Sequence, residues 1–156
     1  MTKARLGGTY TFITGGSRGI GRAVAERFAA EGSTVAINHY RDDKEAEATL
    51  VSVKDISRKN GFESAQHKIA AADVSDRTAI HDAIDHVVKE WGRLDCLINN
   101  AGIQAETPGD GFDPSTFEKI VAVNLMGAAY ASEKAIAHFQ TRAGGGSIIN
   151  TTSVHE

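Results

Sequence analysis

The sequence has little of several features that define whole classes of proteins. It contains one cysteine, Cys96, in 156 residues, which excludes an internal disulfide framework and a cysteine-based zinc site. No apolar run approaches the roughly 18 residues that a membrane-spanning helix needs. The first residues lack the apolar stretch of a secretory signal. These absences predict a single soluble globular domain in a reducing cytoplasm, without contact to a membrane.

Excess charge of one sign is also absent. The net charge is -3, so the chain lacks the basic balance that non-specific nucleic-acid binding requires. The six histidines show no metal-ligand spacing. His81 and His86 are five residues apart and would not share a helix face, so we expect no metal site. Cys96 falls in a predicted strand, where we expect it to be buried and unreactive.

Segments typical of strands alternate with segments typical of helices. Short β-branched or aromatic runs predict strands at residues 9–14, 33–38, 64–72, 94–98 and 147–150. Apolar residues at helical spacing predict helices from about residue 20 to Gly32, over 42–59, from the cap at Ser75-Asp76 to Trp91, and from the cap at Asp113-Pro114 past Ala128. This order predicts an α/β fold, a doubly wound parallel sheet with helices on both faces.

Glycines concentrate in the turn between the first strand and the first helix. Gly15 would allow the tight turn, Gly19 would let the backbone approach a pyrophosphate, and Gly21 would permit close packing of helix on strand. The free N–H groups and the dipole of the helix N-terminus would then face the phosphates. The alternative is a purely structural glycine turn, but the position inside a βαβ unit favours dinucleotide binding.

Four motifs, in this order, resemble the short-chain dehydrogenase/reductase family. They are Thr14-Gly15-Gly16-Ser17-Arg18-Gly19-Ile20-Gly21, Asp73-Val74, Asn99-Asn100-Ala101-Gly102, and the strand ending Asn150-Thr151-Thr152-Ser153. The resemblance covers the whole chain and is strongest to glucose dehydrogenase-like and 3-oxoacyl-ACP reductase-like members. It implies a Rossmann-type domain and an NAD(P)-dependent oxidoreductase that interconverts a secondary alcohol and a carbonyl by hydride transfer.

The resemblance also implies which residues bind the cofactor. They are Gly15, Ser17, Arg18, Gly19, Ile20, Gly21, Arg41, Asp73, Val74, Asn100, Ala101 and Gly102. After the second strand the chain carries Arg41 and no acid before Asp42, and Arg18 adds a second cation. This favours NADP over NAD, since a basic residue accommodates the 2′-phosphate. Two alternatives stay open: Asp42 binds the ribose of NAD, or both arginines are merely solvated.

Two residues of the chain match the family's catalytic positions. Ser153 follows the last predicted strand and would hydrogen-bond the reacting oxygen, with Thr152 as the competing hydroxyl. Asn124 matches the asparagine that organises the family's proton-relay water. It falls in register with an apolar helix stripe (Phe117, Ile120, Val121, Leu125 and Ala128), so we expect it to be buried. In a generic protein it would be a helix asparagine bonded to nearby backbone.

The family's acid/base pair, Tyr-x-x-x-Lys, has no counterpart after Ser153. Tyr130 and Lys134 have the spacing but precede Ser153, so they are interpreted as an i, i+4 helix pair. We therefore expect residues 1–156 to be one incomplete NAD(P)-binding domain that lacks C-terminal strands and helices and leaves an apolar face uncovered. The expected substrate is a small alcohol or carbonyl compound, and the full-length protein is expected to be a homodimer or homotetramer. The alternatives are a non-catalytic dinucleotide-binding module and an inactive fragment.

Overall fold

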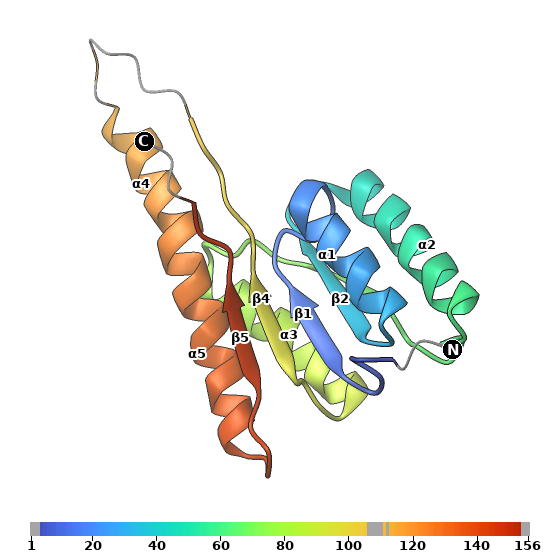
Figure 1. Cartoon of the computed structure of the whole chain (residues 1–156). Helices are drawn as coiled ribbons and strands as arrows, with labels where there is room; N and C mark the ends of the chain where they lie inside the picture. Colours follow the sequence, from blue (N-terminus) through green and yellow to red (C-terminus); the bar gives the residue numbers. More distant parts are fainter. Residues whose placement is uncertain (1–3, 106–110, 112, 154–156) are drawn as a thin grey trace.

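Five parallel strands form one sheet in the order β3-β2-β1-β4-β5. The computed structural model describes residues 4–105, 111 and 113–153, with helices on both faces of this sheet (Figure 1). The strands are β1 (Tyr10–Ile13), β2 (Thr34–His39), β3 (Lys68–Ala71), β4 (Cys96–Asn99) and β5 (Ser147–Asn150). The helices are α1 (Gly19–Ala30), α2 (Asp43–Lys59), α3 (Arg77–Trp91), α4 (Pro114–Val121), the π-helical turn η1 (Ala122–Met126) and α5 (Gly127–Gln140). The predicted fold class is confirmed.

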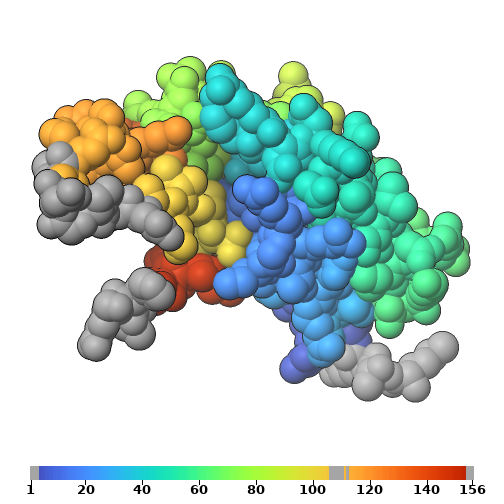
Figure 2. Space-filling model, turned by 90° about the horizontal axis from the view of Figure 1, so that it is seen from above, coloured from blue at the N-terminus to red at the C-terminus, as the bar shows by residue number. Residues whose placement is uncertain are grey.

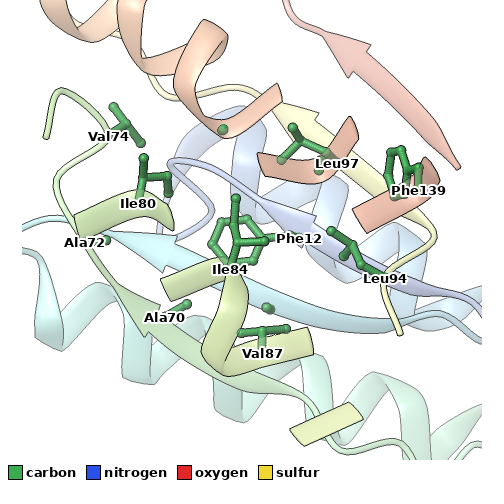
Figure 3. Close-up of a cluster of buried hydrophobic side chains, with 13 residues drawn as sticks. Phe12, Ala70, Ala72, Val74, Ile80, Ile84, Val87, Leu94, Leu97 and Phe139 are labelled. Atoms are coloured by element: carbon green, nitrogen blue, oxygen red, sulfur yellow. The ribbon is translucent and has the colours of Figure 1, made fainter. Parts of the chain in front are cut away.

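Two hydrophobic clusters lie on opposite faces of the sheet because successive strand residues point in opposite directions. Phe12 of β1 points into the cluster formed with α3 and α5, where Figure 3 shows it beside Ile84 and Leu97. Ile13, the next residue, joins Ala25 and the other side chains on the α1 and α2 face. All five of these side chains are at most 3% exposed. β1 therefore lies in the middle of the sheet and of the core.

The predicted helix ends are confirmed where the sequence carries capping residues. The Asp76 carboxylate accepts a hydrogen bond from the backbone N–H of Ala79 at 3.0 Å, and Asp113 accepts one from Ser115 at 3.0 Å. Gly32, the glycine predicted to end the first helix, follows the C-terminus of α1 and has a left-handed φ of +95°. These caps satisfy backbone groups that a helix end leaves unpaired.

The third strand is shorter than predicted. Only Lys68–Ala71 pair with β2, whereas residues 64–67 are turn and loop. The reason is a side chain: Nδ1 of His67 accepts the hydrogen bond from the backbone N–H of Val35 at 3.0 Å. The imidazole is therefore the hydrogen-bond partner of that N–H. The pairing of β2 with β3 begins one residue later, at Ala36 and Lys68.

The helix predicted after Asp113 is interrupted by η1, and its apolar stripe is not buried. Phe117 and Leu125 are 53% and 63% exposed, and α4 and η1 contain no buried residue. Ile136 of α5 and Ile149 of β5 are also exposed. Large apolar side chains are therefore exposed on α4, η1, α5 and β5, as expected, and the stripe that includes Asn124 is not buried.

One further expectation needs correction. Cys96 is half-buried rather than buried, and burial, together with the neighbouring Asp95 carboxylate, raises the pKa of its thiol to about 11. Tyr130 and Lys134 lie four residues apart in α5, as expected, and Nζ of Lys134 also lies 2.5 Å from the carboxylate of Asp85 on α3. Across the described ranges, no helix combines the length and apolar character needed to cross a membrane.

Candidate functional site

A cleft of about 540 Å³ opens at the carboxyl ends of β1, β2 and β4. In the view from above, the surface is hollowed where the loops after β1 (blue), β2 (cyan) and β4 (yellow) meet (Figure 2). The strand order reverses at β1, between β2 and β4, and such switch points are where open parallel sheets bind ligands. The location of the cleft thus follows from the topology.

The glycine loop is closely packed on one side and open on the other. A Cβ on Gly15 would lie 2.8 Å from Cα of Ala101, and one on Gly21 would overlap the carbonyl oxygen of Gly15. Gly19 has a left-handed φ of +55° and open space where its Cβ would be. The open side leaves the backbone N–H groups at the start of α1 accessible. A pyrophosphate can therefore approach them closely.

The loop after β4 holds the glycine loop in place. The Thr14 hydroxyl accepts hydrogen bonds from the backbone N–H groups of Asn100 (2.9 Å) and Ala101 (3.0 Å). The Asn100 side chain donates in return to the carbonyls of Thr14 (3.1 Å) and Gly15 (3.0 Å). Asn100 and Ala101 therefore position the loop as well as lining the cleft.

Asn38, which sequence reasoning did not include among the site residues, fixes the other side of this loop. Its Oδ1 accepts from the backbone N–H of Gly15 at 3.3 Å, and its Nδ2 donates to the carbonyls of Ala70 and Ala72. The residue is 1% exposed. The signal was present, because an asparagine in an otherwise buried strand must find hydrogen-bond partners.

Charged side chains gather at the end of the cleft beyond β2. Arg18, Arg41 and Asp42 all line it. Asp42 accepts a hydrogen bond from the Ser17 hydroxyl at 2.7 Å and lies 3.7 Å from Nε of Arg18. Arg41 has a left-handed φ of +54°, unusual for a residue with a side chain, and its guanidinium lies 4.8 Å from the ring centre of Tyr40. Both arginines are thus held at one end of the cleft.

Asp73 and Val74 line the cleft from the loop after β3. The Asp73 carboxylate accepts from the backbone N–H and the hydroxyl of Ser75 at 2.9 and 2.6 Å, which closes the turn before α3. Val74 is 6% exposed and packs under Gly127, where an added Cβ would lie 2.8 Å from its Cγ2. This contact joins the cleft wall to the start of α5.

Asn124 is exposed rather than buried, contrary to the expectation. It lies in η1, and its amide bonds the backbone of Ile103 in both directions, accepting from N–H at 2.8 Å and donating to C=O at 2.9 Å. The physical reason is that η1 turns toward the loop after β4, whose backbone satisfies the side chain. Each amide atom keeps one further hydrogen-bonding position.

A second hollow of about 390 Å³ lies between the ends of β4 and β5 and the helix formed by η1 and α5. Asn124 and Thr152 line it, and Ser153 follows Thr152 and is exposed. Ala101 lines both hollows, so they adjoin. Asn124 therefore lines a hollow that adjoins the cleft, and Ser153 directly follows Thr152 of the same lining.

Asn99 was also missed as a candidate. It is 5% exposed, and its Nδ2 donates at 2.9 Å to the hydroxyl of Ser132 and to Oδ1 of Asn150. These bonds fasten the end of β5, and with it the segment that leads to Ser153, to α5. Among the described residues its Oδ1 has no hydrogen-bond partner.

The predicted cofactor residues converge. All of them except Gly19 line the 540 Å³ cleft, and Gly19 lies in the same loop. Several lining residues were not predicted from the sequence as site residues: Asn38, His39, Tyr40, Ser75, Ile103, Lys119 and Val123. Lys119 comes from α4 and adds a cation that belongs to none of the four motifs. A group of three or more histidine, cysteine, aspartate or glutamate residues able to hold a metal is not found in the described part of the chain.

The parallel sheet and the glycine loop define a Rossmann-type nucleotide-binding domain. Residues 9–156 match the family described as short chain dehydrogenase, and the chain belongs to this family. The glucose 1-dehydrogenase of Gluconobacter oxydans is 34% identical over 154 residues, which are 99% of this chain and 55% of that protein. The chain spans about half the length of the curated relatives it matches.

Solved structures of the family agree with the fold. A short chain dehydrogenase from Burkholderia cenocepacia in complex with NADP is 33% identical, with a TM-score of 0.85 over 96% of this chain and 57% of that one. An NAD+-bound xylitol dehydrogenase is 27% identical, with the same TM-score over 96% of this chain and 54% of that one. Proteins similar to this chain thus include complexes with either dinucleotide.

Proposed function

We propose that this chain is the NAD(P)-binding domain of an oxidoreductase that interconverts a secondary alcohol and a carbonyl, with NADP preferred and NAD accepted. The observation that carries the proposal is the cleft at the switch point, where an open glycine loop that contains Arg18 meets Arg41 from the segment after β2. We place the protein in the cytoplasm, as a homo-oligomer in its full-length form.

In this proposal the N-terminus of α1, with Gly19 and Gly21, receives the pyrophosphate. Asp73 and Val74 would hold the adenine, and Asn100, Ala101 and Gly102 would line the path toward the nicotinamide. Arg18 and Arg41 take the adenosine ribose with its 2′-phosphate, because a guanidinium forms paired hydrogen bonds with phosphate oxygens. The bound nicotinamide supplies or accepts the hydride.

The chain's own residues act on the substrate oxygen and the proton. The exposed Ser153 hydroxyl donates a hydrogen bond to the carbonyl oxygen, which polarises it toward attack at carbon. One acceptor site and one N–H of the Asn124 amide bind the backbone of Ile103. The remaining acceptor site and N–H order a water in the second hollow. In this proposal that water would pass the proton between solvent and the reacting oxygen.

The test is a fluorescence titration of the full-length protein with NADPH and with NADH, followed by an assay for oxidation of each. We expect both to bind and NADPH to bind more tightly. Arg18→Gln and Arg41→Gln should each weaken NADPH about tenfold and leave NADH within about twofold, because only NADPH carries the 2′-phosphate. Arg27→Gln, near the opposite end of α1 and paired with Glu31, is the matched control and should change neither. Equal losses for both nucleotides would contradict the NADP preference.

The alternative is a protein that binds the dinucleotide without turnover. Tight binding of NADPH with no oxidation across a panel of aldehydes, ketones and sugars would select this alternative.

A further inference from the structure

One buried polar side chain in the wall of the cleft is not used by the proposed function. His39 is the last residue of β2, lines the cleft and is 4% exposed. Its Nδ1 accepts a hydrogen bond from the backbone N–H of Asp42 at 3.3 Å, and its Nε2 lies 3.6 Å from the carboxylate of Asp43. Since Nδ1 accepts, the proton of the neutral ring is on Nε2, the nitrogen that faces this carboxylate.

The imidazole closes the turn between β2 and α2. The backbone carbonyl of His39 accepts a hydrogen bond from the N–H of Ala72, just beyond β3, at 2.9 Å. The imidazole of the same residue binds the N–H of Asp42, which immediately precedes α2. Only Tyr40 and Arg41 lie between these two residues. His39 therefore restrains the short segment that carries Arg41.

Arg41 has a backbone conformation that needs such a restraint. Its φ of +54° lies in the left-handed region, which the Cβ of an L-residue makes unfavourable. Residues stay in this region only where the surrounding structure holds them there. Without the bond to the imidazole, the backbone of Arg41 could leave the left-handed region. Its guanidinium, which lies 4.8 Å from the ring centre of Tyr40, would then change direction relative to the cleft.

We propose that His39 is a positioning residue for the adenosine end of the cleft. Its Nδ1 holds the N–H of Asp42, which keeps Arg41 left-handed and directs the guanidinium into the cleft. His39 acts through Arg41 and not by contact with the nucleotide. The inference rests on the proposed function, in which Arg41 binds the 2′-phosphate, and adds to it the residue that holds Arg41 in place.

The test is a double-mutant cycle of His39→Leu and Arg41→Gln, measured by calorimetry on the full-length protein. The two probes are adenosine 2′,5′-bisphosphate and adenosine 5′-monophosphate, which differ only by the 2′-phosphate. His39→Asn is the conservative variant, because its side-chain oxygen, like Nδ1, is bonded to Cγ and accepts hydrogen bonds. The control is His86→Leu, since the His86 side chain is 68% exposed and is not among the described residues that line the cleft.

We expect His39→Leu to weaken the bisphosphate about tenfold and the monophosphate less than about twofold, because Arg41 serves the 2′-phosphate. In the Arg41→Gln background, His39→Leu should weaken the bisphosphate by less than a further factor of about two, since the group it positions is already gone. His39→Asn should bind the bisphosphate within about threefold of the unaltered protein. His86→Leu should bind both probes as the unaltered protein does.

Three results would overturn the inference: no loss with His39→Leu, equal losses for the two probes, or additive losses of about a hundredfold in the double variant. Thermal unfolding identifies a variant that does not fold. His39→Val, whose side chain suits the end of a strand, replaces His39→Leu in that case. If the unaltered protein binds neither NADPH nor the bisphosphate, the proposed function itself fails. Binding by the unaltered protein together with additive losses leaves the proposed function standing and removes only the role of His39.

Discussion

At the scale of single residues, the close packing of the glycine loop depends on the absence of a Cβ at Gly21. A Cβ on Gly21 would overlap the carbonyl oxygen of Gly15 and approach Nδ2 of Asn100 at 2.6 Å. Both atoms belong to the hydrogen-bonded contact between the glycine loop and the loop after β4, so neither can give way without loss. The close approach of β1 and α1 is therefore set by this residue.

We predict that Gly21→Ala destabilises the protein by about 3 kcal/mol or more, as overpacking in a rigid contact does. Gly92→Ala is the control, because Gly92 has a φ of +76° but open space around its Cβ. It should cost only the roughly 1–2 kcal/mol of left-handed backbone. Urea denaturation of the two variants measures the difference, and equal losses would show that packing at Gly21 is unimportant.

The two hydroxyls at the end of the chain's last strand can be separated by substitution. Ser153→Ala should lower kcat of the full-length protein about a hundredfold with little change in KM, because the lost hydrogen bond acts mainly on the transition state. Thr152→Val removes the competing hydroxyl and should cost less than tenfold. The reverse order of losses would move the role from Ser153 to Thr152.

At the scale of elements, His67 joins β2 and α2 to the segment before β3. Its Nδ1 accepts from the backbone N–H of Val35, and its Nε2 lies 2.6 Å from the Ser57 hydroxyl. Since Nδ1 accepts, the proton of the neutral ring is on Nε2, which donates to Ser57. The pair therefore has no free base to activate the hydroxyl, and its role is structural.

Burial, assisted by the nearby Lys54 cation, lowers the pKa of His67 from 6.5 to about 4. Between these two values the unfolded chain binds a proton that the folded protein does not. The free energy of unfolding should therefore fall as the pH falls from about 6.5 to 4, by at most about 1.4 kcal/mol per pH unit from this group.

Urea denaturation between pH 7.5 and 4 of the unaltered protein and of His67→Gln measures this contribution. The variant should show the shallower pH dependence, since glutamine does not titrate. The control is His86→Gln, which removes a histidine whose side chain is 68% exposed. Identical slopes for the unaltered protein and His67→Gln would contradict the account.

The same histidine shows why element boundaries were the least predictable part of the fold. Residues 64–67 have the composition of a strand start, yet the partner N–H on Val35 is taken by an imidazole ring from residue 67. The π-helical turn at Ala122–Met126 was likewise not predictable from local sequence, and its Asn124 side chain bonds the distant residue Ile103. Local sequence does not predict which distant group will be the hydrogen-bond partner of a backbone group or of a side-chain amide.

At the scale of the whole molecule, the alternation of strands and helices was sufficient to predict the parallel sheet, and the glycine motif was sufficient to locate the cleft. Lys119 of α4 was not predictable, because it reaches the cleft only through the tertiary packing of that helix. Asn124 was predicted to be buried, but its apolar neighbours Phe117 and Leu125 are exposed. Periodicity shows that a helix has an apolar face but not what covers that face.

The proposed function requires that the cleft binds a nicotinamide dinucleotide with its pyrophosphate over the glycine loop. Amide hydrogen exchange of the full-length protein, with and without saturating NADPH, tests it most directly. We predict slower exchange in residues 15–21 and 100–103, which border the cleft, and unchanged exchange around His67, where a separate hollow of about 250 Å³ lies outside the cleft. Unchanged exchange across residues 15–21 at saturating NADPH would contradict the account.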